Sequence, residues 1–117
     1  MANINWLPLE DSQQLEKIEA YSKDTPCIIF KHSTRCSISS LAQHRLENKW
    51  AFDESALLPY FLDLISYRHI SEAVAKKFGV QHESPQLLLI QDGQCTYHAS
   101  HLDISVAELS AALAQRV

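Results

Sequence analysis

The chain has few residues that cross-link or interrupt a fold. Its 117 residues include only three cysteines, two glycines and four prolines. Three cysteines are too few for a disulfide scaffold, and an odd number leaves at least one free thiol. The low glycine and proline content, together with 46% hydrophobic residues, excludes a disordered chain. We therefore expect a single domain over residues 1–117 with one hydrophobic core.

Dense positive charge and long apolar segments are also missing. The net charge is −4, and the lysines and arginines are scattered along the chain. Binding to nucleic acid or to an anionic membrane therefore gains no electrostatic support. The first six residues lack the basic flank and apolar stretch of a secretory signal, and no segment is long enough to span a bilayer. We expect a cytoplasmic protein that binds neither nucleic acid nor membrane.

Hydrophobic periodicity predicts alternating helices and strands. Apolar runs indicate strands over 27–30, 57–65, 86–90 and 95–100, and helical spacing indicates helices over 12–22, about 37–48, 70–78 and 106–113. The last two strands are joined by Asp92-Gly93, a strong hairpin signal. This order predicts an α/β, thioredoxin-like fold with a central mixed sheet of about four strands and helices on both faces.

Cys36 follows an apolar strand and a polar turn, where the next helical pattern begins. Its sulfur should therefore lie at a helix N-terminus. The free N–H groups and the positive end of the helix dipole favour a thiolate there, which is the species that attacks disulfides. We interpret Cys36 as the nucleophile. The alternative is a small structural residue at the start of a helix.

Ser39 occupies the place of the second cysteine in a Cys-x-x-Cys motif. A hydroxyl cannot close a disulfide, so the site must form a mixed disulfide with its substrate and wait for an external thiol. Ser39 is also expected to donate a hydrogen bond to the Cys36 sulfur. The sequence predicts monothiol chemistry.

Ser84-Pro85 precedes a strand, at the position where thioredoxin-like domains carry a cis-proline opposite the reactive sulfur. Proline withholds an N–H donor, which leaves the Ser84 backbone groups free to pair with an extended substrate. We expect these residues to shape a substrate groove. A trans proline that starts a strand is the alternative.

The other chemistry-bearing residues give weaker signals. Cys27 is expected to be packed, and Cys95 is expected to be packed unless it acts as a distant resolving thiol. His32 is read as a solvated loop histidine that could influence Cys36, and Asp63 as either a proton relay or an exposed strand residue. The six histidines lack the paired spacing of metal ligands, so no metal site is predicted.

The segment from Phe30 to Ser39, the Ser84-Pro85-Gln86 junction and the C-terminal Ser100-His101 resemble the YtxJ-type monothiol bacilliredoxins over nearly the whole chain. The family pattern is Thr-Cys-Pro-Ile-Ser. Here Arg35 separates Thr34 from the cysteine and Ser37 replaces the proline, which leaves the reduction potential and partner preference open.

The resemblance implies a thioredoxin-like fold and a role in stress response, with Cys36 as the redox cysteine. The bound substrate would lie against five residues: Thr34, Arg35, Ser37, Ser84 and Pro85. The implied partners are proteins that carry mixed disulfides with a small thiol. No bound cofactor is implied, and bacillithiol is the expected co-substrate.

Two other functions are open on the sequence alone. A glutaredoxin-like iron–sulfur carrier would use Cys36 from two chains together with two external thiols. A non-catalytic redox sensor would be modified at the same cysteine without turnover.

Overall fold

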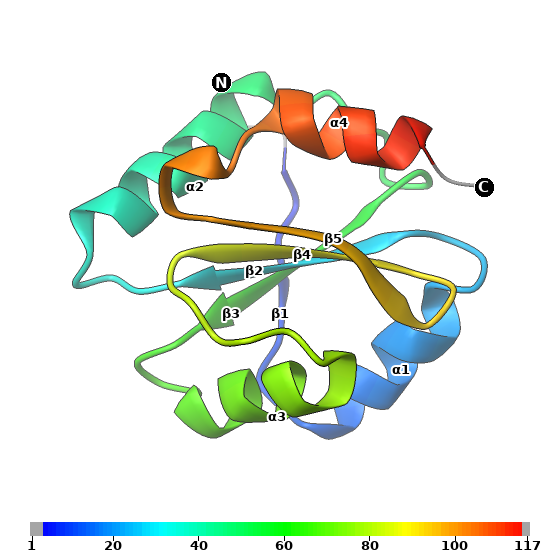
Figure 1. The fold of residues 1–117 in the computed structure, drawn as a ribbon, viewed down its shortest axis with the longest axis horizontal. Helices are drawn as coiled ribbons and strands as arrows, with labels where there is room; N and C mark the ends of the chain where they lie inside the picture. The colour runs from blue at the N-terminus through cyan, green and yellow to red at the C-terminus, as the bar shows by residue number, and fades with distance from the viewer. Residues whose placement is uncertain (1–3, 116–117) are drawn as a thin grey trace.

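The computed structural model describes residues 4–115 as a five-stranded sheet with helices on both faces (Figure 1). The strands are β1 (Leu7–Pro8), β2 (Cys27–His32), β3 (Leu58–Asp63), β4 (Gln86–Gln91) and β5 (Gln94–Ser100). The helices are α1 (Gln13–Tyr21), α2 (Ser37–Lys49), α3 (Arg68–Phe78) and α4 (Val106–Ala114), with a short 3-10 helix η1 (His101–Asp103) before α4. The predicted α/β class and helix–strand alternation are confirmed.

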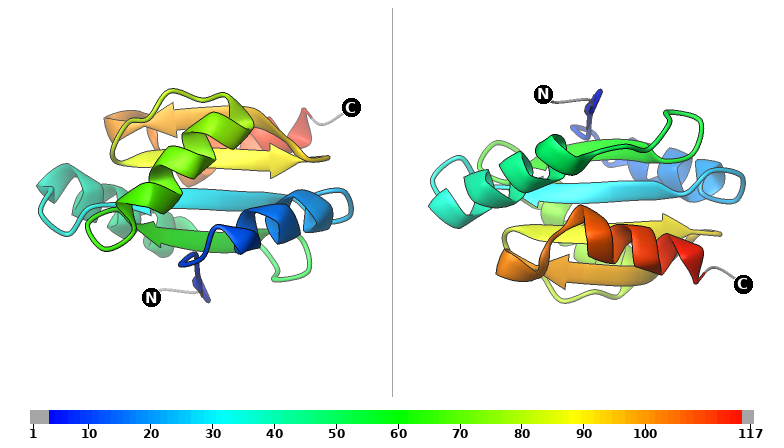
Figure 2. Two further views of the ribbon diagram at one scale, coloured as in Figure 1. Left: turned by 90° about the horizontal axis from the view of Figure 1, so that it is seen from below. Right: turned by 90° about the horizontal axis from the view of Figure 1, so that it is seen from above.

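The strand order across the sheet is β1-β3-β2-β4-β5. Strands β1, β3 and β2 run parallel, whereas β4 and β5 are antiparallel to their neighbours. Helices α1 and α3 cover one face, and α2 and α4 cover the other (Figure 2). Because both faces are covered, the central strands β2 and β4 are buried along their whole length.

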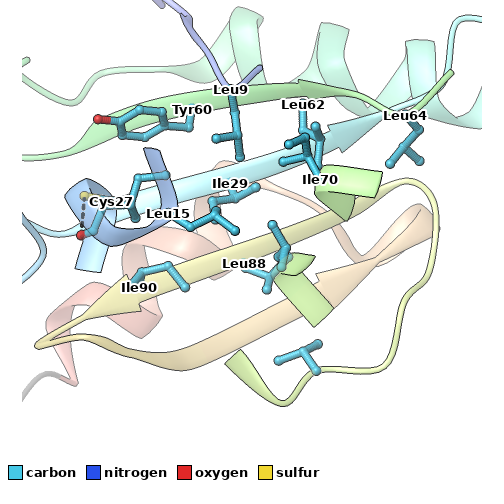
Figure 3. Close-up of a cluster of buried hydrophobic side chains, with 13 residues drawn as sticks. Leu9, Leu15, Cys27, Ile29, Tyr60, Leu62, Leu64, Ile70, Leu88 and Ile90 are labelled. Atoms are coloured by element: carbon cyan, nitrogen blue, oxygen red, sulfur yellow. Dashed lines mark hydrogen bonds between the residues drawn. The ribbon is translucent and has the colours of Figure 1, made fainter. Parts of the chain in front are cut away.

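Alternating residues of β2 supply the two halves of the core. Cys27 and Ile29 pack in the cluster beneath α1 and α3, while Ile28 and Phe30 pack in the cluster beneath α2 and α4. Figure 3 shows the first cluster, in which Cys27 lies at one end and Leu64 at the other. The continuous apolar run of the strand is therefore needed for both layers.

Three local sequence features fix the ends of elements, and one of them is the predicted Asp92-Gly93 turn. Gly79 ends α3 in the left-handed region at φ 67°. Asp92 and Gly93 both have positive φ, 54° and 77°, as a tight hairpin turn between β4 and β5 requires. The Ser105 hydroxyl accepts the N–H of Glu108 at 3.1 Å and so caps α4.

The structure differs from the expectation in two strands. Edge strand β1 was not predicted, and it raises the count from about four strands to five. Two residues, one of them Pro8, are too few to show a period of two. Strand β2 also continues past Phe30, where the predicted strand ends, through Lys31 and His32, the second of which was expected in the polar turn.

The segments that contain the predicted site residues meet at one end of the sheet. Strand β2 ends at His32, β3 ends beside it at Asp63, and β4 begins beside it at Gln86. In open α/β sheets, ligands bind outside the carboxyl ends of the parallel strands. Among residues 4–115, no helix is long and apolar enough to cross a membrane.

Candidate active site

Cys36 lies at the N-cap of α2, as the sequence predicts. Its backbone is extended, with φ −116° and ψ 117°, and the helix begins at the next residue. Its N–H donates to the Ser33 carbonyl at 3.2 Å, and its carbonyl accepts the Ser40 N–H at 3.2 Å. The thiol is free and the residue is half-buried. Unpaired N–H groups at a helix start stabilise negative charge, so this position suits a nucleophilic thiolate.

The Ser84–Pro85 peptide bond is cis, which confirms the predicted cis-proline. Gln86 pairs with Lys31 near the end of β2, so the proline loop lies at the Cys36 end of the sheet. The Pro85 carbonyl accepts the His101 N–H at 3.1 Å and ties the loop to the end of β5. The loop is therefore held in place from both sides.

The remaining predicted substrate-binding residues surround the cysteine in sequence. Thr34 and Arg35 form the exposed turn between β2 and α2, and Ser37 is the exposed first residue of the helix. The Arg35 N–H donates to the Ser33 hydroxyl at 3.4 Å, a weak contact that closes the turn. Their exposure makes these side chains accessible to a partner.

Ser39 does not make the expected hydrogen bond to sulfur in the part of the chain that the structure describes. It lies on the buried face of α2 and has no exposed surface. Its hydroxyl is 2.6 Å from His32 Nδ1 and accepts the Ser33 N–H at 3.0 Å. A buried imidazole needs a hydrogen-bond partner, and Ser39 supplies it. The residue therefore fixes the turn that carries Cys36.

His32 is a buried strand residue, so its interpretation as a solvated loop histidine was wrong. It is 5% exposed, and its ring centroid lies 6.0 Å from that of Phe30 and 5.3 Å from that of Phe61. Burial lowers the pKa of His32, although the carboxylates of Asp63 and Glu47 oppose this. The ring is therefore held in its neutral form at neutral pH. The sequence pattern did not indicate that β2 continues to His32 and stays buried to this last residue.

Asp63 organises the loop between β3 and α3. It is half-buried and pairs with His32 in the sheet register. Its carboxylate accepts the Ile65 N–H at 3.1 Å and the Ser66 hydroxyl at 3.0 Å. These bonds occupy both oxygens in a local turn, a structural role that the sequence did not indicate.

Cys27 and Cys95 lie at the other end of the sheet. Both pair with Ile90 in adjacent strands, and Cys27 opens β2 whereas Cys36 follows its end. Five residue steps along β2 separate the two ends by roughly 16 Å. Burial raises the pKa of Cys27 to about 12 and also raises the pKa of Cys95. Neither thiol is placed to resolve a disulfide at Cys36 of the same chain.

Within residues 4–115, no group of three or more histidine, cysteine, aspartate or glutamate side chains could hold an ion.

Solved structures share this arrangement. A protein described as having a thioredoxin fold is 29% identical, with a TM-score of 0.76 and 92% of each chain covered. Thioredoxin from Malassezia sympodialis is 15% identical, with a TM-score of 0.73, over 98% of this chain and 93% of that one. Thioredoxin f from spinach chloroplast is 14% identical, with a TM-score of 0.68, over 93% and 90%. At 15% and 14% identity, the similarity to these two thioredoxins shows a shared fold alone.

The fold, with a half-buried cysteine where α2 begins, is that of a thioredoxin-like thiol oxidoreductase. A narrower assignment comes from the sequence family. The model of the family described as "Monothiol bacilliredoxin BrxC" matches residues 7–109. The chain therefore belongs to the monothiol bacilliredoxin family.

Proposed function

We propose that the protein removes bacillithiol from mixed disulfides on other proteins, through Cys36 alone. The observation that carries the proposal is the separation of the cysteines. Cys36 lies at one end of the sheet beside the cis-proline loop, and Cys27 and Cys95 lie at the other. The substrates are proteins modified by a low-molecular-weight thiol, and the reaction suits a reducing compartment such as the cytoplasm.

The reaction has two exchange steps. The Cys36 thiolate attacks the bacillithiol sulfur of the mixed disulfide; a new S–S bond forms to Cys36 and the protein leaves as its thiolate. Free bacillithiol, as thiolate, then attacks the same bacillithiol sulfur. Cys36 leaves as thiolate and bacillithiol disulfide is released. In the two steps together, the disulfide between the protein and bacillithiol is replaced by a disulfide between two bacillithiol molecules. No other oxidant or reductant is needed.

The chain's own residues prepare the first step. Cys36 lies at the N-cap of α2, where unpaired N–H groups favour negative charge, and Ser39 with His32 fixes the turn before it. The backbone of Ser84 precedes the cis-proline and offers hydrogen-bonding groups to an extended substrate. Exposed Thr34, Arg35 and Ser37 complete the contact surface around the sulfur.

A chain that keeps only Cys36 tests the monothiol mechanism. We expect the double variant Cys27→Ala/Cys95→Ala to reduce a bacillithiolated protein within about twofold of the wild-type rate when bacillithiol is in excess, because neither thiol takes part. Steady-state release of the protein thiol is the measurement. A loss of tenfold or more in the correctly folded double variant contradicts the mechanism, because a second cysteine would then be resolving the intermediate.

A further inference from the structure

A hollow of about 380 Å³ opens between the active-site turn, the β3–α3 loop and the cis-proline loop. Its volume falls within the range of ligand pockets, about 300–1,000 Å³. Ser33, three residues before Cys36, borders one side, and Ser84, directly before the cis-proline, borders another. The lining residues are Ser33, Leu64, Ile65, Arg68, Ser71, Glu72, His82 and Ser84. Cys36 donates its N–H to the Ser33 carbonyl, so the cysteine is in direct contact with a residue that lines this space.

Lys31 has no exposed surface and contacts His82, one of the residues that line the hollow. Its ammonium donates to His82 Nδ1 at 3.2 Å, and Ser71 Oγ lies 3.1 Å from the same nitrogen. No carboxylate of residues 4–115 lies within 4.0 Å of the ammonium. Burying a cation without a counter-ion costs desolvation free energy. Because little water screens the charge, it is also a strong local source of positive potential.

The contact with Lys31 also fixes the tautomer of His82. An ammonium can only donate, so Nδ1 must accept and the ring proton is on Nε2. Burial lowers the pKa of His82, and the charges of Lys31 and Arg68 lower it further. His82 therefore lines the hollow as a neutral ring with one N–H to donate. Lys31 does not line the hollow itself, and its role is to position the His82 ring that does.

Unpaired polar atoms lie at the same end of the sheet. Ser84 Oγ is buried and lacks a hydrogen-bond partner within residues 4–115, and so does Gln86 Oε1 beside Lys31 in the sheet. Buried polar atoms without partners are rare in folded proteins and call for an explanation. Ser84 is one of the residues that line the hollow, and its buried hydroxyl lies in the wall behind that lining.

The charges around the hollow are mixed but favour an anion. Arg68 is exposed at its rim and forms no ion pair with a carboxylate of residues 4–115. Glu72 lies on the same rim, and Glu83 is close enough to His82 to oppose the lowering of its pKa. Both carboxylates are exposed, so water screens them, whereas Lys31 is screened less.

We propose that this hollow binds a carboxylate of the low-molecular-weight thiol while that thiol is joined to Cys36. The inference rests on the proposed function. Arg68 is the charged donor and the His82 Nε2–H is the neutral donor, and Leu64 and Ile65 add apolar surface to the lining. An acidic side chain of the substrate protein presents the same chemistry, and the test separates these two sources.

Three small disulfides without any protein component test the preference. They are dithiodipropionate, which carries carboxylates, the neutral 2-hydroxyethyl disulfide, and cystamine, which carries amines. We expect Cys36 of the full chain to react with dithiodipropionate at least about fivefold faster than with the neutral disulfide, and with cystamine most slowly. The second-order rate is followed by the intact mass of the adduct at pH 7 and low salt.

Arg68→Gln and His82→Gln are expected to lower the preference for the carboxylate at least about threefold. Lys76→Gln is the matched control, because it removes the same charge from exposed surface of α3 about 12 Å away along the helix. We expect it to keep the wild-type preference. An equal loss in Lys76→Gln overturns the site, because the effect would then come from net charge.

A binding measurement separates this inference from the proposed chemistry. In the Cys36→Ser protein, succinate should shift the backbone amide resonances of Ser33, Ser71 and Ser84, and uncharged succinamide should not. Equal rates with all three disulfides overturn the assignment to the small thiol even if succinate binds. If Cys36 reacts with none of the disulfides, the proposed function fails, and the succinate titration alone decides whether the hollow is an anion site.

Discussion

Replacing Cys36 with serine is expected to lower the rate of release of bacillithiol from a modified protein at least about 10³-fold. The reason is chemical. A serine hydroxyl at the N-cap of α2 keeps the local backbone but cannot form an S–S bond, so the first exchange step has no nucleophile. The measurement is the initial rate of appearance of the protein thiol at saturating bacillithiol.

The matched control removes a thiol from the opposite end of the sheet. Cys95→Ser leaves the α2 N-terminus and the cis-proline loop untouched, and we expect it to retain the wild-type rate within about twofold. If Cys36→Ser retains more than a tenth of the wild-type rate while remaining folded, Cys36 is not the nucleophile.

Replacing Lys31 with methionine is expected to raise the free energy of unfolding at pH 7 by roughly 1–3 kcal/mol. Burial lowers the pKa of Lys31 from 10.5 to about 8, so folding carries a desolvation cost as long as the amine is charged. Methionine fills a similar volume without that cost. Urea denaturation of the full chain measures the difference.

The pH dependence gives this prediction a definite sign. Between about pH 8 and 10.5 the unfolded chain still binds a proton at Lys31 that the folded chain has lost, so wild-type stability rises with pH there. The advantage of Lys31→Met is therefore full below pH 8 and shrinks as the pH approaches 10.5. Lys49→Met, on the exposed end of α2, should change stability by less than about 0.5 kcal/mol at both ends of this range.

A constant difference between Lys31→Met and wild type from pH 7 to pH 10 contradicts the assignment of a buried charge. A variant that is less stable than wild type at pH 7 contradicts the predicted gain in stability, because the Lys31 contact with His82 would then outweigh the desolvation cost.

Much of the fold follows from local chemistry that is visible in the sequence. Gly79, Asp92-Gly93 and Ser105 each demand a particular backbone conformation or cap, and each is found in the element that it predicts. The apolar run from Cys27 to Phe30 indicates a strand covered on both faces, and its burial agrees. These features depend on residues within a few positions of one another.

The polar end of β2 could not be predicted in this way. The predicted strand stops before Lys31, and His32 looks like a turn residue, because polar side chains are seldom fully buried. Their burial depends on partners distant in sequence: His82 in the α3–β4 loop for Lys31, and the ring of Phe61 on β3 for His32. Edge strand β1 was missed for a similar reason, since its pairing with β3 is set by tertiary contacts.

In the candidate site, too, the features set by neighbouring residues were predicted and those set by distant residues were not. Cys36 and the Ser84–Pro85 bond were predicted, because a helix start and an X-Pro junction are local patterns. The role of Ser39 was only half predicted. Its lack of a thiol is evident from the sequence, whereas its hydrogen bond to His32 requires knowing that both are buried. The hollow beside Ser84 is formed by three separate segments and has no signature in any of them.

We propose that Cys36 works alone, through a mixed disulfide with the small thiol. The most direct measurement is the intact mass of the protein after mixing with a bacillithiolated substrate in the absence of free bacillithiol. We expect one added bacillithiol, located at Cys36 by peptide mapping and removed when free bacillithiol is supplied. A protein that gains no adduct and loses two hydrogens, as an internal disulfide requires, contradicts it.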